Sequence, residues 1–120
     1  MKYSIEGLTV AITQMEEMLA FYTAVFQMDF EAQEMHGFKL YHGQWGDLKL
    51  LFCPAALAGN TAQQNRHQFD VLVDDLEQVI ETAQKHGGKL MSEPQEQAGQ
   101  RSVGIMDPDN NSIVFKQNLS

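Results

Sequence analysis

The sequence repeats itself weakly with an offset of about 61 residues, close to half its length. In the first copy Leu8, Val10 and Ile12 alternate with small or polar residues. Phe69 and Val71 begin the same alternation in the second copy. A period of two is typical of a strand with one buried face. The repeat therefore predicts two similar halves that each open with such a strand.

A capped helix is expected after the first strand of each half. Thr13 and Glu16 match a capping box, and Asp74 and Glu77 repeat that chemistry. Apolar residues then recur at helical spacing in both halves. The second helix should end at residues 86–88, His-Gly-Gly, because glycine readily adopts the positive φ of a helix C-terminus.

Three further strands are expected in each half, separated by turns at residues 43–46 and 107–111 before the last one. The fold class is therefore α+β, with two βαβββ modules that form an open, cup-shaped mixed sheet with helices outside. Module one is assigned to residues 1–56, the linker to 57–65 and module two to 66–120. The predicted strands that follow the helices are 29–35, 37–42, 47–53, 89–92, 102–106 and 112–116.

Composition excludes several kinds of function. The 120 residues include 16 acidic and 8 basic side chains, and the net charge of -8 argues against nucleic-acid binding. No apolar run reaches the ~20 residues of a membrane helix, and residues 1–6 lack a signal-peptide pattern. The single cysteine, Cys53, suits a reducing compartment. We expect a cytoplasmic protein whose partner is neither nucleic acid nor membrane.

Three short motifs follow one another along the chain. They are Phe21-Tyr22 in the first helix, Val-Asp-Asp-Leu at residues 73–76, and Asp-Pro-Asp-Asn-Asn at residues 107–111. Their order and spacing resemble the vicinal oxygen chelate superfamily, which includes glyoxalase I, bleomycin-resistance proteins and extradiol dioxygenases. Asn110 and Gln27 stand where that family usually has glycine, and asparagine is the best substitute at a positive φ. The resemblance implies one glyoxalase-like domain over residues 1–120, and a homodimer.

The resemblance also implies where a divalent metal would bind. Active members use His, Gln or Glu on the first strand of each half and Glu on a fourth strand. The matching places here hold Gly7 or Leu8, Gln68, Leu50 and Val114. One glutamine cannot hold such an ion against water, because these sites need about three protein ligands. We therefore expect no metal of the family type and no other cofactor.

An aromatic wall for a small ligand is predicted on the concave surface of the first half. Tyr41 and Trp45 flank the predicted turn before the last strand, and Phe52 lies in that strand. Aromatic walls with a few polar groups are a common way to hold small planar molecules. Packing in a loop or at a dimer contact is the alternative for Trp45.

Polar candidates lie mostly in the second half. Gln68 and Asp70 share the strand parity opposite to the apolar row, so both are expected to face the ligand. A carboxylate in mid-strand is costly unless it is solvated or paired, and Asp70 is also a candidate general base. Thr9 is its equivalent in the first half. Arg101 could bind a carboxylate in a bidentate manner if it faces inward, and is a surface charge otherwise.

Histidines offer an alternative site. His36, His42 and His67 could form an atypical metal site if the strands bring them together, but their spacing matches no metal motif. Scattered positions in turns and at strand ends are the favoured interpretation. Cys53 ends an apolar strand and is expected to be a buried, inert thiol.

The favoured function is metal-independent binding or sequestration of a small molecule, akin to the bleomycin-resistance type. A cationic or amphipathic ligand would suit the net charge. One alternative is a lyase, isomerase or dioxygenase-type enzyme with an atypical site, in which Asp70 or a histidine is the base. Another is an interaction module whose main surface is the dimer interface. Inward-facing Thr9, Gln68 and Asp70 would favour a ligand site.

Overall fold

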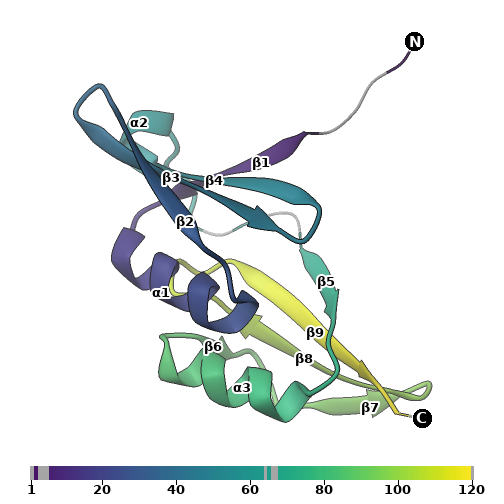
Figure 1. The fold of residues 1–120 in the computed structure, drawn as a ribbon. Helices are drawn as coiled ribbons and strands as arrows, with labels where there is room; N and C mark the ends of the chain where they lie inside the picture. The colour runs from purple at the N-terminus through teal and green to yellow at the C-terminus, as the bar shows by residue number, and fades with distance from the viewer. Residues whose placement is uncertain (1, 3–5, 64, 66–67, 120) are drawn as a thin grey trace. The chain divides into compact units, whose positions relative to one another are not determined.

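A computed structural model describes residues 2, 6–63, 65 and 68–119 (Figure 1). These residues belong to two compact units, Met1–Thr61 and Ala62–Ser120. The boundary between the units lies within the segment 57–65 that the sequence predicts as a linker. The closing of both sheets into one cup stays a prediction, and each unit is described by itself.

The first unit has the predicted βαβββ order, followed by one short helix. Its four-stranded sheet has the order β1-β4-β3-β2, in which β1 is parallel to β4 and the other neighbours are antiparallel. The elements are β1 (Gly7–Ile12), α1 (Met15–Phe26), β2 (Phe30–Met35), β3 (Phe38–Trp45), β4 (Leu48–Pro54) and α2 (Ala55–Ala58).

The second unit repeats this plan with one additional short strand, β7, which the sequence did not predict. Its five-stranded sheet has the order β5-β9-β8-β6, β7 also pairs with β8, and β5 is parallel to β9. The elements are β5 (Phe69–Leu72), α3 (Leu76–Lys85), β6 (Lys89–Leu90), β7 (Gln95–Gln97), β8 (Gln100–Met106) and β9 (Ser112–Asn118). The α+β class with two mixed sheets is thereby confirmed.

Both predicted helix starts are wrong by one residue. The N-cap of α1 is Gln14 rather than Thr13. The N-cap of α3 is Asp75, whose carboxylate accepts a hydrogen bond from the backbone N–H of Gln78 at 3.1 Å. Two adjacent aspartates at 74 and 75 offer the same cap chemistry in two registers, so the pattern alone does not distinguish them.

Positive φ angles occur at both places where the sequence lacks the family's glycine. Gln27 ends α1 at φ 54, and Asn110 has φ 67 in the turn before β9. The predicted end of α3 is also confirmed, because Gly87 has φ 87 and the Gly88 N–H bonds to the Ala83 carbonyl at 2.8 Å. These backbone requirements are thus met without glycine at 27 and 110.

The core of the first unit lies between α1 and one face of its sheet. Met18 and Phe21 of α1 are fully buried. The Tyr22 ring lies 5.1 Å from the Phe52 ring and 5.7 Å from the Trp45 ring, measured between centroids. Because side chains alternate along a strand, the opposite face of this sheet is left without the helix.

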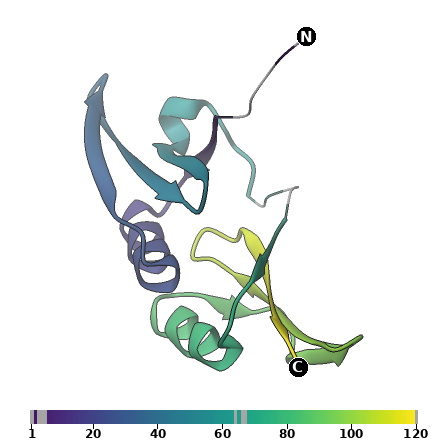
Figure 2. The same ribbon diagram turned by 45° about the vertical axis from the view of Figure 1, so that its right-hand side comes forward.

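In the second unit, too, a helix lies against one face of the sheet (Figure 2). Helix α3 packs on β6, β8 and β9, with Ile80 and Ala83 buried toward the sheet. Ile105 and Phe115 are fully buried from the strands. No helix among the described residues is long and apolar enough to cross a membrane.

A buried carboxylate organises the turn before β9. Asp107 is 1% exposed and accepts hydrogen bonds from the backbone N–H groups of Asp109 and Asn111, each at 2.9 Å. The side-chain amide of Asn111 donates to the same carboxylate at 3.1 Å. The turn predicted at residues 107–111 is confirmed, and its aspartate is a structural acceptor.

Candidate functional site: the open face of the first unit

The face of the first sheet opposite α1 is called the open face. Cross-strand register places Thr9 beside Leu51, Leu51 beside His42, and His42 beside Glu31. One row of side chains therefore crosses all four strands. Leu51 supplies an apolar centre to this row, and its neighbours supply a hydroxyl, an imidazole and a carboxylate.

A second row runs parallel to the first. Register places Gly7 beside Lys49, and Lys49 beside Gln44. A Cβ atom at Gly7 would lie only 2.8 Å from the Lys49 carbonyl oxygen, so the glycine permits this close approach of β1 to β4. The second row is polar, and its position on β1, Gly7, has no side chain.

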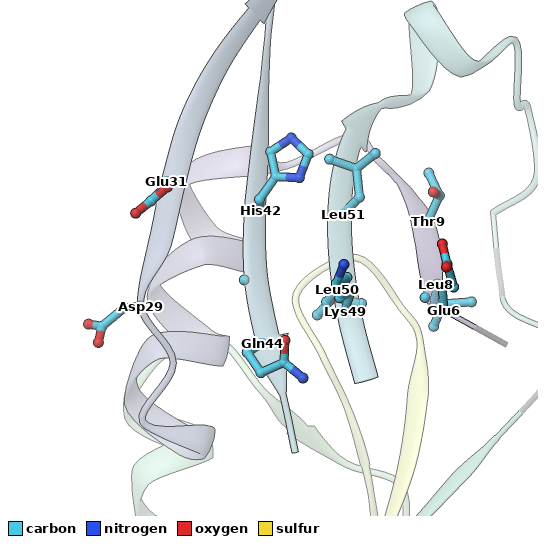
Figure 3. A pocket seen from close by; sticks show the side chains of 12 residues that line it. Glu6, Leu8, Thr9, Asp29, Glu31, His42, Gln44, Lys49, Leu50 and Leu51 are labelled. Carbon is cyan, nitrogen blue, oxygen red and sulfur yellow. The ribbon is translucent and has the colours of Figure 1, made fainter. Parts of the chain in front are cut away.

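The two rows line a pocket with a volume of ≈ 770 Å³ (Figure 3). Thr9, Leu51 and His42 stand side by side along it, on β1, β4 and β3, with Gln44 and Lys49 in the row below. Glu6, Asp29 and Glu31 place three carboxylates at its margins. The volume is within the range of small-molecule sites.

One end of the open face is not part of the pocket. Leu40 and Cys53 share the parity of His42 and Leu51, yet both are buried. The short helix α2 contacts β1 and β4 there. Burial of Cys53 agrees with the expected inert thiol, and the pocket is limited to the other end of the face.

His42 has a side-chain partner on β2. Its Nε2 atom lies 2.5 Å from the amide oxygen of Gln33. An amide oxygen can only accept a hydrogen bond, so this contact is a hydrogen bond in the imidazole tautomer that carries its hydrogen on Nε2. The contact fixes the orientation of the imidazole at the pocket.

Of the predicted residues in the first unit, Thr9 lines the pocket and the aromatic residues do not. Phe52 is fully buried against Tyr22, and the Trp45 ring lies 5.2 Å from that of Phe26 in α1. Tyr41 is directly across from Phe52 in the register and shares its face. These three aromatic residues therefore belong to the helix-covered side.

Trp45 faces the helix rather than the pocket because β3 extends further along the chain than the sequence predicts. The sequence predicts a turn over residues 43–46, but Trp45 is the last residue of the strand, and only Gly46 and Asp47 separate it from β4. Gly46 has φ 59, which makes this two-residue connection possible. A residue inside the ladder has a fixed face, and that of Trp45 is the helix-covered one.

In the second unit, Gln68 and Asp70 fit the predicted parity. Ser112 Oγ lies 3.4 Å from Gln68 Oε1, and the Lys116 ammonium lies 3.4 Å from Asp70. Asp70 and Lys116 are both exposed to a large degree. Asp70 is therefore a solvated, paired carboxylate on the side of its sheet opposite the core residues Ile113 and Phe115.

Arg101 does not face the open side of its sheet. It shares the parity of the buried Val103 and Ile105, and its guanidinium forms an ion pair with Glu77 of α3. The inward-facing interpretation of Arg101 is wrong, because the strand alternation directs this side chain to the helix. The alternative, a surface charge, describes it.

Replacing Arg101 with alanine is expected to lower the free energy of unfolding by no more than about 1 kcal/mol. The ion pair with Glu77 is solvent-exposed on the glutamate side, and exposed pairs gain little over water. Chemical denaturation of the variant measures this, and binding of any ligand identified for the wild type should be unchanged. A tenfold loss of affinity in the folded variant would restore Arg101 to the site.

The places implied for a family-type metal do not fit a divalent ion. Gly7 has no side chain, Leu50 is buried toward α1, and Val114 is apolar. Over residues 6–63, 65 and 68–119, no three His, Cys, Asp or Glu side chains come together in a way that could hold a metal. His36 lies in an exposed turn at φ 52, and His67 lies outside the described residues.

Sequence reasoning missed His42, Gln44, Lys49 and Leu51 as pocket residues. The pattern of β3 does not reveal its two faces, because Leu40 is buried on one face while Tyr41 and Trp45 lie on the other. The available signal was Lys49, a charge between leucines in β4. A lysine there marks the solvent-facing parity, which Leu51 and Thr9 share.

Two βαβββ units, each with one sheet face covered by its own helix, define the vicinal oxygen chelate class. The chain belongs to the glyoxalase-like domain family, whose profile matches residues 7–115. The comparison with curated proteins finds no match.

Solved structures of low sequence identity share the fold. A glyoxalase/bleomycin resistance protein/dioxygenase family enzyme from Burkholderia phytofirmans PsJN has 17% identity and a TM-score of 0.77, covering 98% of this chain and 100% of that chain. The fosfomycin resistance protein FosX from Mesorhizobium loti has 17% identity and a TM-score of 0.74, with 98% and 94% covered. TnmS3, an antibiotic binding protein from Streptomyces sp. CB03234, has 16% identity and a TM-score of 0.70, with 98% and 97% covered.

Proposed function

We propose that this protein binds a small organic molecule on the open face of its first unit and sequesters it without a metal. The pocket of ≈ 770 Å³ carries this proposal. It has the composition that a small-molecule site needs, with Leu51 as an apolar floor and Thr9, His42 and Gln44 as orienting polar groups.

One of the structural relatives supports the choice of binding. TnmS3 is named an antibiotic binding protein. The unsuitable donor set at the family's metal positions argues in the same direction. An enzyme of the lyase, isomerase or dioxygenase type remains the competing outcome of the test.

Gln68 and Asp70 stay predictions, as polar groups on the open side of the second unit's own sheet. Arg101, Trp45 and Phe52 are removed from the proposal, because their side chains are used in packing or pairing within their own units. Tyr41 is removed because it shares the helix-covered face of Phe52. We also propose a homodimer in the cytoplasm, which size-exclusion chromatography with light scattering and fractionation of cells would test.

Replacing Leu51 with tryptophan is expected to weaken ligand binding at least about tenfold, because the indole would occupy the centre of the pocket and clash with its contents. A thermal-shift screen of small amines, aromatic acids and neutral heterocycles identifies the ligand first. A ligand at 100 times its Kd should add about 2.7 kcal/mol of stability to the wild type. Leu51→Trp should lose that gain.

Glu34→Trp is the matched control. Glu34 is exposed on β2 and does not line the pocket, so the same indole placed there should leave the ligand-induced shift intact. The proposal fails if Leu51→Trp binds as well as the wild type. It also fails if the protein purifies with stoichiometric metal and turns over a catechol or an α-oxoaldehyde–thiol adduct.

A further inference from the structure

We propose that His42 selects the ligand by accepting a hydrogen bond, so that the pocket takes a protonated amine attached to a small apolar body. This inference rests on the proposed function and deepens it by naming a ligand class. It is carried by the contact between His42 and Gln33 and by the place of His42 in the pocket.

The first step is the hydrogen on the imidazole. Gln33 presents its amide oxygen to His42 Nε2 at 2.5 Å, and this oxygen cannot donate. We take Nε2 to donate to this oxygen as part of the proposal, so that in the neutral ring the other nitrogen, Nδ1, keeps its lone pair. A ligand that meets Nδ1 must offer an N–H or O–H group.

The second step is the chemistry around His42. Glu31 lies directly beside it on β2, and Leu51 lies directly beside it on β4. An ammonium group could donate to both the imidazole and the carboxylate, and charge-assisted bonds are the stronger ones. Leu51 is placed to contact the apolar part of the same molecule.

The third step is the balance of charge over the whole pocket. The lining of the pocket includes three carboxylates, Glu6, Asp29 and Glu31, and one lysine, Lys49 of β4. An anionic ligand would meet three carboxylates and a lone pair at Nδ1, whereas a cationic one would be attracted by them. The pocket therefore distinguishes an amine from a carboxylate of the same shape.

Matched probes test this selection. We expect phenethylamine to bind at millimolar concentration in an NMR titration of ¹⁵N-labelled full-length protein, with shift changes confined to pocket residues. Phenylacetate, an anion of similar size, should bind at least about tenfold more weakly. Equal binding of the two probes would overturn the inference, as would the absence of binding by phenethylamine.

Variants of His42 test the acceptor atom. An asparagine side chain can place its oxygen near the position of Nδ1, whereas a glutamine side chain reaches the position of Nε2. His42→Asn should therefore keep the affinity for phenethylamine within about threefold, and His42→Leu should lose about tenfold, the value of one charge-assisted hydrogen bond. An unchanged affinity in His42→Leu would contradict the role of His42.

The role of Gln33 has its own readout. Long-range ¹H–¹⁵N spectra of the neutral imidazole distinguish the protonated ring nitrogen from the unprotonated one. In the wild type Nδ1 should be the unprotonated atom, and Gln33→Leu should increase the fraction of the other tautomer. A protonated Nδ1 in the wild type would overturn the inference, while the thermal-shift screen with Leu51→Trp decides the proposed function separately.

Discussion

Replacing Phe52 with alanine is expected to lower the free energy of unfolding by about 3 to 5 kcal/mol. Phe52 is fully buried, and its ring lies 5.1 Å from Tyr22 and 5.0 Å from Phe30. Truncation removes these aromatic contacts and leaves a cavity between β4 and α1 that the sheet cannot close. Urea denaturation followed by circular dichroism measures the loss.

Leu51→Ala is the control for this variant, because Leu51 is the preceding residue on the same strand and faces the pocket. Being only half-buried, it should cost distinctly less stability than Phe52 while weakening ligand binding. The opposite order, with a stable Phe52→Ala that has lost binding, would show that Phe52 is a wall of the ligand site and that the assignment of faces is wrong.

Replacing Asp107 with alanine is expected to lower the free energy of unfolding by about 3 kcal/mol, the second largest effect. Its buried carboxylate accepts from two backbone N–H groups and from the Asn111 amide. Without it, these donors remain in a half-buried turn with no acceptor of equal strength, and the start of β9 loses its fixed geometry. Urea denaturation and amide hydrogen exchange of residues 109–113 measure this.

Asp75→Ala is the comparison for Asp107. Asp75 is exposed and supplies one N-cap hydrogen bond to α3, whose loss typically costs about 1 kcal/mol. Both variants remove an aspartate that accepts a hydrogen bond from a backbone N–H. The difference between their losses in the free energy of unfolding therefore reports the effect of the burial of Asp107 and of its larger number of hydrogen bonds. Equal losses in the two variants would contradict the structural role given to Asp107.

The repeated architecture could be predicted from the sequence because each half carries the same local signals. Alternation over residues 8–12 and 69–73 predicted the first strands, and glycines at 87 and 88 predicted the end of α3. Signals of this kind depend on neighbouring residues only. The cap of α3 failed by one residue because acceptors stand next to each other at 74 and 75. The cap of α1 failed because Gln14, its N-cap residue, makes no side-chain cap hydrogen bond.

The pocket could not be predicted because its residues are assigned by contacts between distant elements. Leu40 lies on the open face, at the end of the sheet where α2 contacts it, and is buried there. Tyr41, the next residue, lies on the other face, which carries α1. Because Leu40 and Tyr41 are adjacent and both apolar, the alternation of apolar and polar residues does not show which of them faces the helix. Arg101 failed for a related reason, since its partner Glu77 lies 24 positions away on α3.

The parallel pairing of β1 with β4 and of β5 with β9 has a consequence for folding. Gly7 meets Lys49 and Phe69 meets Ile113, so the strand made first in each unit is held by the strand made last. Closing a loop of roughly forty residues costs entropy that only the finished pair repays. During synthesis the first strand of each unit therefore cannot make this pairing until the last strand has emerged, so the pairing depends on contacts that are distant in sequence.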